Sequence, residues 1–225
     1  MATQKNLLRK DRKQAARIIA LLAIMFALIF VAMMLDKMVS MFLPTGISTA
    51  SITLLVTFSL CFLHNEWWIG FAAGIMFGLA SWLTAFIFGT PITVNPLVSV
   101  LPRIFVGIAA FSVYRIILLL FKTKTTRKAQ IVSITIATAV GLILNTVLFL
   151  TALNVYKQVM GQDYTALFEI IKIVLYTNII PEYAISIVAV PLVVLGVRTG
   201  LKLGIDGNNY KRAAQAENSY TDINN

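Results

Sequence analysis

The chain has 225 residues, of which 59% are hydrophobic and only 12% are charged. Its mean hydropathy is +0.85, whereas a soluble domain is nearer half apolar and a quarter charged. This composition excludes a soluble domain and predicts an integral membrane protein with a single helical bundle. The net charge of +10 would suit nucleic acid, but the basic residues lie in short loops and tails beside apolar segments. We therefore expect a lipid bilayer, and no nucleic acid, as its surroundings.

Six apolar segments are long enough to be read as membrane spans. The first, at 18–35, follows a basic segment at 1–14 and is predicted to be retained, since no small-residue cleavage site follows it. An outer loop is predicted at 36–46, beginning with Asp36 and Lys37. The further spans are expected at about 47–63, 69–88, 97–121, 129–155 and 165–201, the last bent at Pro181. The sequence thus predicts an all-α, polytopic, six-helix transmembrane bundle at 15–204 and a disordered polar tail at 205–225.

Lysine and arginine are distributed unevenly between the predicted loops. The N-terminal segment, the loop at 122–128 and the C-terminal end are basic, whereas the loops at 36–46, 89–96 and 156–166 carry only Lys37 and Lys157. Cytoplasmic loops of membrane proteins are enriched in Lys and Arg. Both termini are therefore predicted to be cytoplasmic.

Small residues recur at helical spacing in two of the spans. The third span has glycines at GxxxG spacing: Gly70, Gly74 and Gly78. The first span has four alanines on one helix face: Ala16, Ala20, Ala23 and Ala27. Such faces let another helix approach closely. The alanine face is either a docking surface for another protein or ordinary packing within the bundle.

A single charge, Arg103, stands near the start of the fourth predicted span, in the run NPLVSVLPRIFVG at 95–107. It lies about 12 Å below the outer end of that span at about 1.5 Å per residue. A guanidinium at membrane depth costs roughly 2.5–3.5 kcal/mol on insertion scales. Arg103 is either a structural residue that caps backbone carbonyls beside Pro102 or an anion-binding residue in a buried pocket.

Other rare polar residues are expected in the outer half or the middle of the predicted bundle. Asn145 lies in the fifth predicted span, and Asn178 and Glu182 lie in the last one. Together with Asn95 and Arg103 they form the candidate substrate-binding set, in a pocket open to the outside. Arg103 favours a ligand carboxylate, and the amides suit hydroxyl or amide groups. Glu182 would either orient Arg103 as a counter-charge or accept a hydrogen bond from the ligand.

The sequence offers little for catalysis. Glu182 is the only carboxylate placed deep in the predicted bundle, no histidine accompanies it, and no GxxxxGK[ST] phosphate loop is present. We therefore expect no catalytic site, no metal site, no cofactor and no ATPase activity of its own. Two other classes remain open: a secondary transporter, although no internal repeat is visible, and a membrane assembly protein.

Three segments together resemble the substrate-binding S components of energy-coupling factor vitamin transporters. They are the run at 95–107, GLILNTVLFLTALNVY at 141–156 and YTNIIPEYAISIVAVPLV at 176–193. The resemblance covers spans three to six and implies a six-helix protein of a prokaryotic cell membrane that binds a water-soluble vitamin from outside. It also implies docking on a transmembrane coupling protein that carries two ATPase subunits. The family's docking surface includes an AxxxA pattern, which the first-span alanines match.

The resemblance is less specific for the vitamin. Pantothenate, a small carboxylate with amide and hydroxyl groups, suits Arg103 and the two asparagines and is the first choice. Folate also carries carboxylates, and cobalamin transporters belong to the same broad group, so folate, cobalamin or another vitamin remain alternatives.

Overall fold

A computed structural model describes residues 2–42, 51–89, 94–121, 126–159, 161 and 180–201. Throughout this part every regular element is a helix, which confirms the all-α prediction. Five helical stretches are long and apolar enough to cross a membrane: Ile18–Phe42, Trp67–Ile87, Pro96–Leu120, Arg127–Tyr156 and Glu182–Gly200. A sixth apolar helix, Ile52–Leu63, is shorter. The length and apolar composition of these helices support the prediction of a membrane protein, while the six-span count and the orientation stay predictions. The tail at 205–225 lies outside the described residues.

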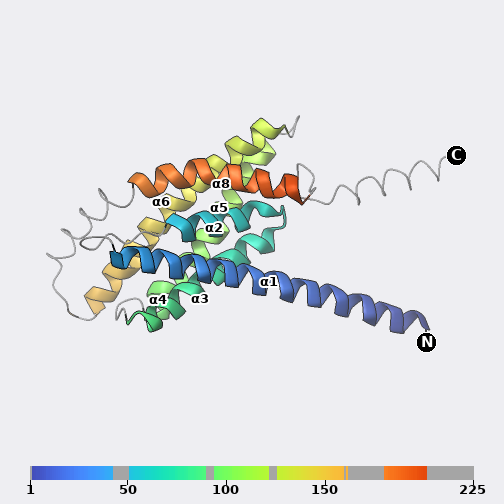
Figure 1. Cartoon of the computed structure of the whole chain (residues 1–225), viewed down its shortest axis with the longest axis horizontal. Helices are drawn as coiled ribbons and strands as arrows, with labels where there is room; N and C mark the ends of the chain where they lie inside the picture. The colour runs from blue at the N-terminus through green and yellow to red at the C-terminus, as the bar shows by residue number, and fades with distance from the viewer. Residues whose placement is uncertain are drawn as a thin grey trace.

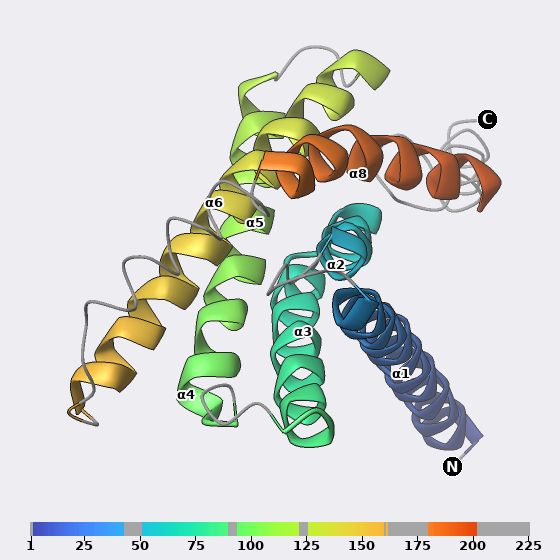
Figure 2. The same ribbon diagram turned by 60° about the vertical axis from the view of Figure 1, so that its left-hand side comes forward.

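The helices form a bundle built around α2 and α5. The elements in chain order are α1 (Ala2–Phe42), α2 (Ser51–Leu63), α3 (Trp67–Ile87), α4 (Pro96–Ser99), α5 (Leu101–Leu120), α6 (Arg127–Val159) and α8 (Ile180–Gly200). Helix α5 packs between α3 and α6, and α2 contacts both α1 and α8 (Figure 2). Helices α1 and α6 end, and α4 and α8 begin, at the left-hand side of Figure 1. We call this the predicted outer end.

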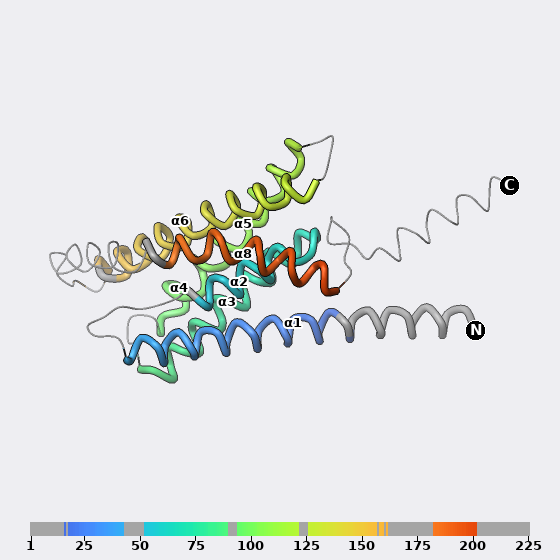
Figure 3. The backbone as a smooth tube through the Cα atoms, turned by 45° about the horizontal axis from the view of Figure 1, so that its top comes forward, coloured from blue at the N-terminus to red at the C-terminus, as the bar shows by residue number. Residues whose placement is uncertain are grey.

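The apolar core surrounds α2. Its largest buried side chains include Phe58 and Phe62 of α2, Met25 of α1 and Tyr114 of α5. The ring centroids of Phe62 and Tyr114 are 5.3 Å apart. Helix α1 runs along one side of this core and α6 along the other (Figure 3). The chain therefore closes its interior with aromatic side chains drawn from several helices.

The prediction of a loop from Asp36 onward is wrong, because α1 continues to Phe42. Asp36 is only 3% exposed, and its carboxylate accepts hydrogen bonds from the backbone of Thr53 at 2.8 Å, the Thr53 hydroxyl at 2.6 Å and the backbone of Ile52 at 3.3 Å. These donors belong to the first turn of α2, where backbone N–H groups lack partners within the helix. The hydrogen-bonding needs of the carboxylate are therefore met inside the bundle, so Asp36 can lie within α1 and the helix can continue beyond it.

Arg198 holds the opposite end of α2. This side chain of α8 is 3% exposed and donates to the carbonyl oxygens of Phe62 at 2.5 Å and Leu63 at 3.0 Å, and to the Tyr114 hydroxyl at 3.0 Å. With 13 residues, α2 is about 20 Å long. An anion at its N-terminus and a cation at its C-terminus both complement the helix dipole. Side chains from α1 and α8 thus fix the position of this short helix.

The glycines of α3 form the predicted close helix contact, and the partner is α5. A Cβ atom added to Gly74 would lie 2.8 Å from the carbonyl oxygen of Arg103, and one added to Gly78 would lie 3.0 Å from Cα of Val100. On the other side, a Cβ on Gly107 would lie 2.6 Å from the carbonyl oxygen of Gly70. The absence of side chains therefore lets the backbone that carries Arg103 lie directly against α3.

The fourth predicted span is not one continuous helix. It is divided at Val100 into α4 and α5. Pro102 has no backbone N–H and cannot donate to the carbonyl four residues earlier. Asn95 caps the short α4 by accepting a 3.0 Å hydrogen bond from the backbone of Leu97. The interruption lies one turn before Arg103, so the carbonyl oxygen of Ser99 is within reach of the Arg103 side chain.

Candidate functional site

Arg103 lies in the first turn of α5 and makes the contact expected of a structural arginine. Its Nη1 donates to the carbonyl oxygen of Ser99 at 2.5 Å, at the bend beside Pro102. Its Cζ lies 4.9 Å from the ring centroid of Phe77 and 5.5 Å from that of Phe149. Such contacts between a cation and an aromatic ring are favourable when the cation is desolvated. Side chains of α3 and α6 therefore hold the guanidinium from two helices.

The same side chain retains unused donor capacity. Nε of Arg103 is buried and has no hydrogen-bond partner in the described part of the chain. A guanidinium carries five N–H donors, and an unpartnered buried donor costs about 1–3 kcal/mol. Within the same residues, Arg103 forms no ion pair with Glu182. The capping role is thus observed, and one N–H donor of the guanidinium has no partner among the described residues.

Asn145 lies close to this group along α6. It is half-buried and precedes Phe149 by four residues, so the two side chains share a helix face. The next residue, Thr146, forms a 2.8 Å hydrogen bond with the hydroxyl of Tyr183, which donates to the carbonyl of Leu142 at 2.8 Å. These bonds tie α8 to α6 one turn from the ring that contacts Arg103.

Glu182 is half-buried in the first turn of α8. The structure thus brings Glu182 to the predicted outer end but does not pair it with Arg103. Asn178 lies outside the described residues.

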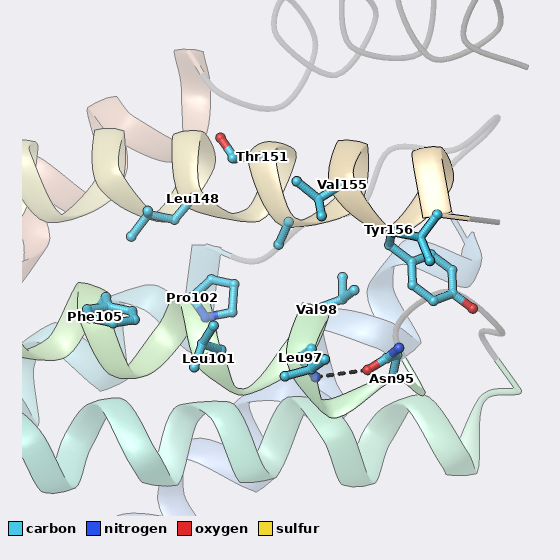
Figure 4. A pocket seen from close by; sticks show the side chains of 12 residues that line it. Asn95, Leu97, Val98, Leu101, Pro102, Phe105, Leu148, Thr151, Val155 and Tyr156 are labelled. Atoms are coloured by element: carbon cyan, nitrogen blue, oxygen red, sulfur yellow. Dashed lines mark hydrogen bonds between the residues drawn. The ribbon is translucent and has the colours of Figure 1, made fainter. Parts of the chain in front are cut away.

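A pocket of about 460 Å³ opens between α4, α5 and α6 at the predicted outer end (Figure 4). Its volume is in the range of small-molecule sites, but its walls are mostly apolar. Among the described residues, the polar side chains that line it are those of Asn95, Thr151 and Tyr156. Pro102 lines this pocket whereas Arg103 does not. Of the candidate substrate-binding residues that the structure describes, only Asn95 lines the pocket, and its side-chain oxygen already accepts the hydrogen bond that caps α4. The pocket is therefore poorly suited to a carboxylate.

Three charged residues of the interior were missed or misplaced by sequence reasoning. The sequence places Asp36 and Lys37 in a loop and does not single out Arg198. Arg198 lies at the predicted inner end, beside Tyr114. The available signal was the same one that marked Arg103, namely a lone charge inside an apolar run.

The alanine face of α1 is exposed. All four alanines lie on the exposed side of the helix, whereas Met25, Ile29 and Met33 on the opposite side are buried. The exposed side is therefore smooth, and within the described residues no other helix covers it. It remains a candidate partner interface.

Comparison with known proteins does not assign the chain to a family. No family model matches the sequence, and no curated protein matches it either.

Proposed function

We propose that this protein is the substrate-binding S component of an energy-coupling factor vitamin importer. The observation that supports the proposal is Arg103, a cation held between aromatic rings inside an apolar helix bundle, with a buried Nε that has no partner among the described residues. The sequence segments around Arg103, Asn145 and Glu182 are those that resemble the family. In this proposal the protein binds its vitamin from outside, with both termini in the cytoplasm of a prokaryote.

The energy for release would come from partners. The chain carries no phosphate-binding loop and is proposed to be no enzyme, so a transmembrane coupling protein with two ATPase subunits would drive transport. The exposed alanine face of α1 is the proposed contact with that coupling protein.

Pantothenate is the proposed substrate, with folate, cobalamin or another vitamin as alternatives. A carboxylate can accept two parallel hydrogen bonds from a guanidinium edge, and Asn145 and Glu182 offer partners for amide and hydroxyl groups. Mass spectrometry of the ligand carried through purification would identify the vitamin directly.

Substitution of Arg103 tests the binding site. We expect Arg103→Ala to weaken pantothenate binding by about 2–5 kcal/mol, because it removes one partner of a buried charge pair. Arg103→Lys keeps the charge but loses the bidentate edge, so a smaller loss is expected. Calorimetric titration of the purified variants measures both effects.

The matched control is Arg115→Ala, which removes an exposed arginine from the other end of α5. Because Arg103 also caps the Ser99 carbonyl, thermal unfolding and gel filtration must show that the Arg103 variants are folded. Pantothenate affinity within a factor of two of the parent in folded Arg103→Ala would mean that Arg103 is structural only.

Substitution on the alanine face tests docking. Ala20→Trp places a large ring where close helix approach needs small residues, so ATPase subunits should no longer co-purify and uptake should fall, while vitamin binding by the isolated protein survives. Leu28→Trp is the control, because Leu28 is 48% exposed on the same helix but lies off the alanine row. Assembly and uptake that persist in Ala20→Trp would rule out this face as the docking surface.

Co-purification also separates the function classes. ATPase subunits that accompany the wild-type protein would support a transport module. A secondary transporter or a membrane assembly protein would bring none.

A further inference from the structure

The pocket between α4, α5 and α6 carries free polar groups at one end only. Figure 4 shows Asn95 and Tyr156 at that end, whereas Phe105 and Leu148 lie at the other. The third polar lining residue, Thr151, donates its hydroxyl to a carbonyl of its own helix at 2.8 Å. The Asn95 amide nitrogen and the Tyr156 hydroxyl can donate hydrogen bonds, and none of the described residues that line the pocket is charged. The pocket therefore suits a ligand with a long apolar body and a polar group at one end.

This polarity runs in the direction that a lipid has in a bilayer. The two apolar stretches that form the walls are Pro96–Leu120 and Arg127–Tyr156. Asn95 and Tyr156 thus stand at the limits of both stretches, at the same end of the bundle. Tyrosine is enriched at membrane–water interfaces, where its hydroxyl stays near the polar headgroups. The polar end of the pocket is therefore expected at an interface and its apolar part within the hydrocarbon.

The pocket also has the depth of one leaflet. Phe105 and Leu148 lie about 12–14 Å inside the limits of their apolar stretches, at about 1.5 Å per residue. One leaflet supplies about half of a hydrocarbon core that is about 30 Å thick. The wall residues Leu101 and Val155 are 49% and 53% exposed, so the pocket is open to the surroundings of the bundle. In a bilayer these surroundings are acyl chains.

We propose that this pocket binds one acyl chain of a membrane phospholipid, with the ester or headgroup oxygens of the lipid at Asn95 and Tyr156. An apolar space left empty forfeits the dispersion contacts of its walls, and an acyl chain restores them without removing a charge from water. Because no described lining residue is charged, the charge of the headgroup should not affect binding. The inference does not depend on the proposed transport function, and it separates this pocket from the site at Arg103.

The test is a lipid titration of delipidated protein in detergent, with native mass spectrometry to count the lipids that stay bound. The probes are dioleoylphosphatidylcholine and dioleoylphosphatidylglycerol, which should bind the parent equally. Ala152→Phe places a ring in the pocket, because Ala152 is a lining residue. Val147→Phe is the control, since it adds the same ring at a position of α6 that is 52% exposed and outside the pocket.

We expect Ala152→Phe to weaken binding of the tightest lipid about tenfold or more. Tyr156→Phe should weaken it about threefold, because one hydrogen bond is lost. Val147→Phe should bind lipid as the parent does. Gel filtration and thermal unfolding establish that Ala152→Phe is folded, and Tyr156→Phe, which removes a single hydroxyl, is the second variant.

Equal lipid binding by the parent, Ala152→Phe and Tyr156→Phe would overturn the proposal. A preference of the parent for dioleoylphosphatidylglycerol would contradict recognition through uncharged groups. Two further results would give the pocket another occupant. A pantothenate affinity that falls in Ala152→Phe while lipid binding persists would place the substrate there. A dimer of the parent that Ala152→Phe abolishes on gel filtration would place a second copy of the chain there.

Discussion

Replacing Gly107 by alanine is expected to separate α5 from α3 and to destabilise the protein strongly. The new Cβ atom would lie 2.6 Å from the carbonyl oxygen of Gly70 and 2.7 Å from Cα of Gly74. These are backbone atoms of a facing helix, so no side-chain rotation can relieve the contact. Overpacking of this kind typically costs about 1–3 kcal/mol. The midpoint of thermal unfolding in detergent should fall accordingly.

Gly196→Ala is the matched control, because a Cβ on Gly196 of α8 meets nothing within 4 Å. Its unfolding midpoint should stay level or rise slightly, since alanine favours a helix over glycine by about 1 kcal/mol. Equal midpoints for Gly107→Ala and Gly196→Ala would show that the α3–α5 contact is looser than the structure has it. Because the α3 contact also positions the backbone of Arg103, Gly107→Ala should weaken ligand binding as well.

Replacing Asp36 by alanine should release the N-terminus of α2 from α1. The substitution removes an acceptor for the backbone N–H groups of Ile52 and Thr53 and for the Thr53 hydroxyl. Each buried donor left without a partner costs about 1–3 kcal/mol, and the favourable charge at the helix N-terminus is lost as well. Thermal unfolding should show a large decrease in stability.

Asp36→Asn separates the loss of the hydrogen-bond acceptor from the loss of charge, because asparagine keeps one acceptor oxygen but carries no negative charge. Its stability should lie between those of the parent and Asp36→Ala. The control is Leu35→Ala, which shortens a neighbouring side chain that is 46% exposed. If Asp36→Ala unfolds at the same temperature as Leu35→Ala, water or another group replaces the carboxylate at α2.

The sequence alone determined the features that depend on local composition and spacing. Apolar runs marked the helices long enough for a membrane, because the length of such a run sets what a helix can cross. The GxxxG spacing marked α3 as a close-packing helix, since residues four apart share a face whatever the partner is. Arg103, Asn145 and Glu182 stood out because a polar group inside an apolar run is costly wherever it lies.

The tertiary structure decided which of those polar groups meet and where helices end. Asp36 and Lys37 lie inside α1 because Thr53 and Ile52 of another helix donate hydrogen bonds to the Asp36 carboxylate. The sequence around Asp36 gives no sign of these donors. Arg198 is buried because the carbonyls of Phe62 and Leu63 end α2 beside it. A charge is tolerated in a membrane helix according to its spatial partners, and those partners are set by packing.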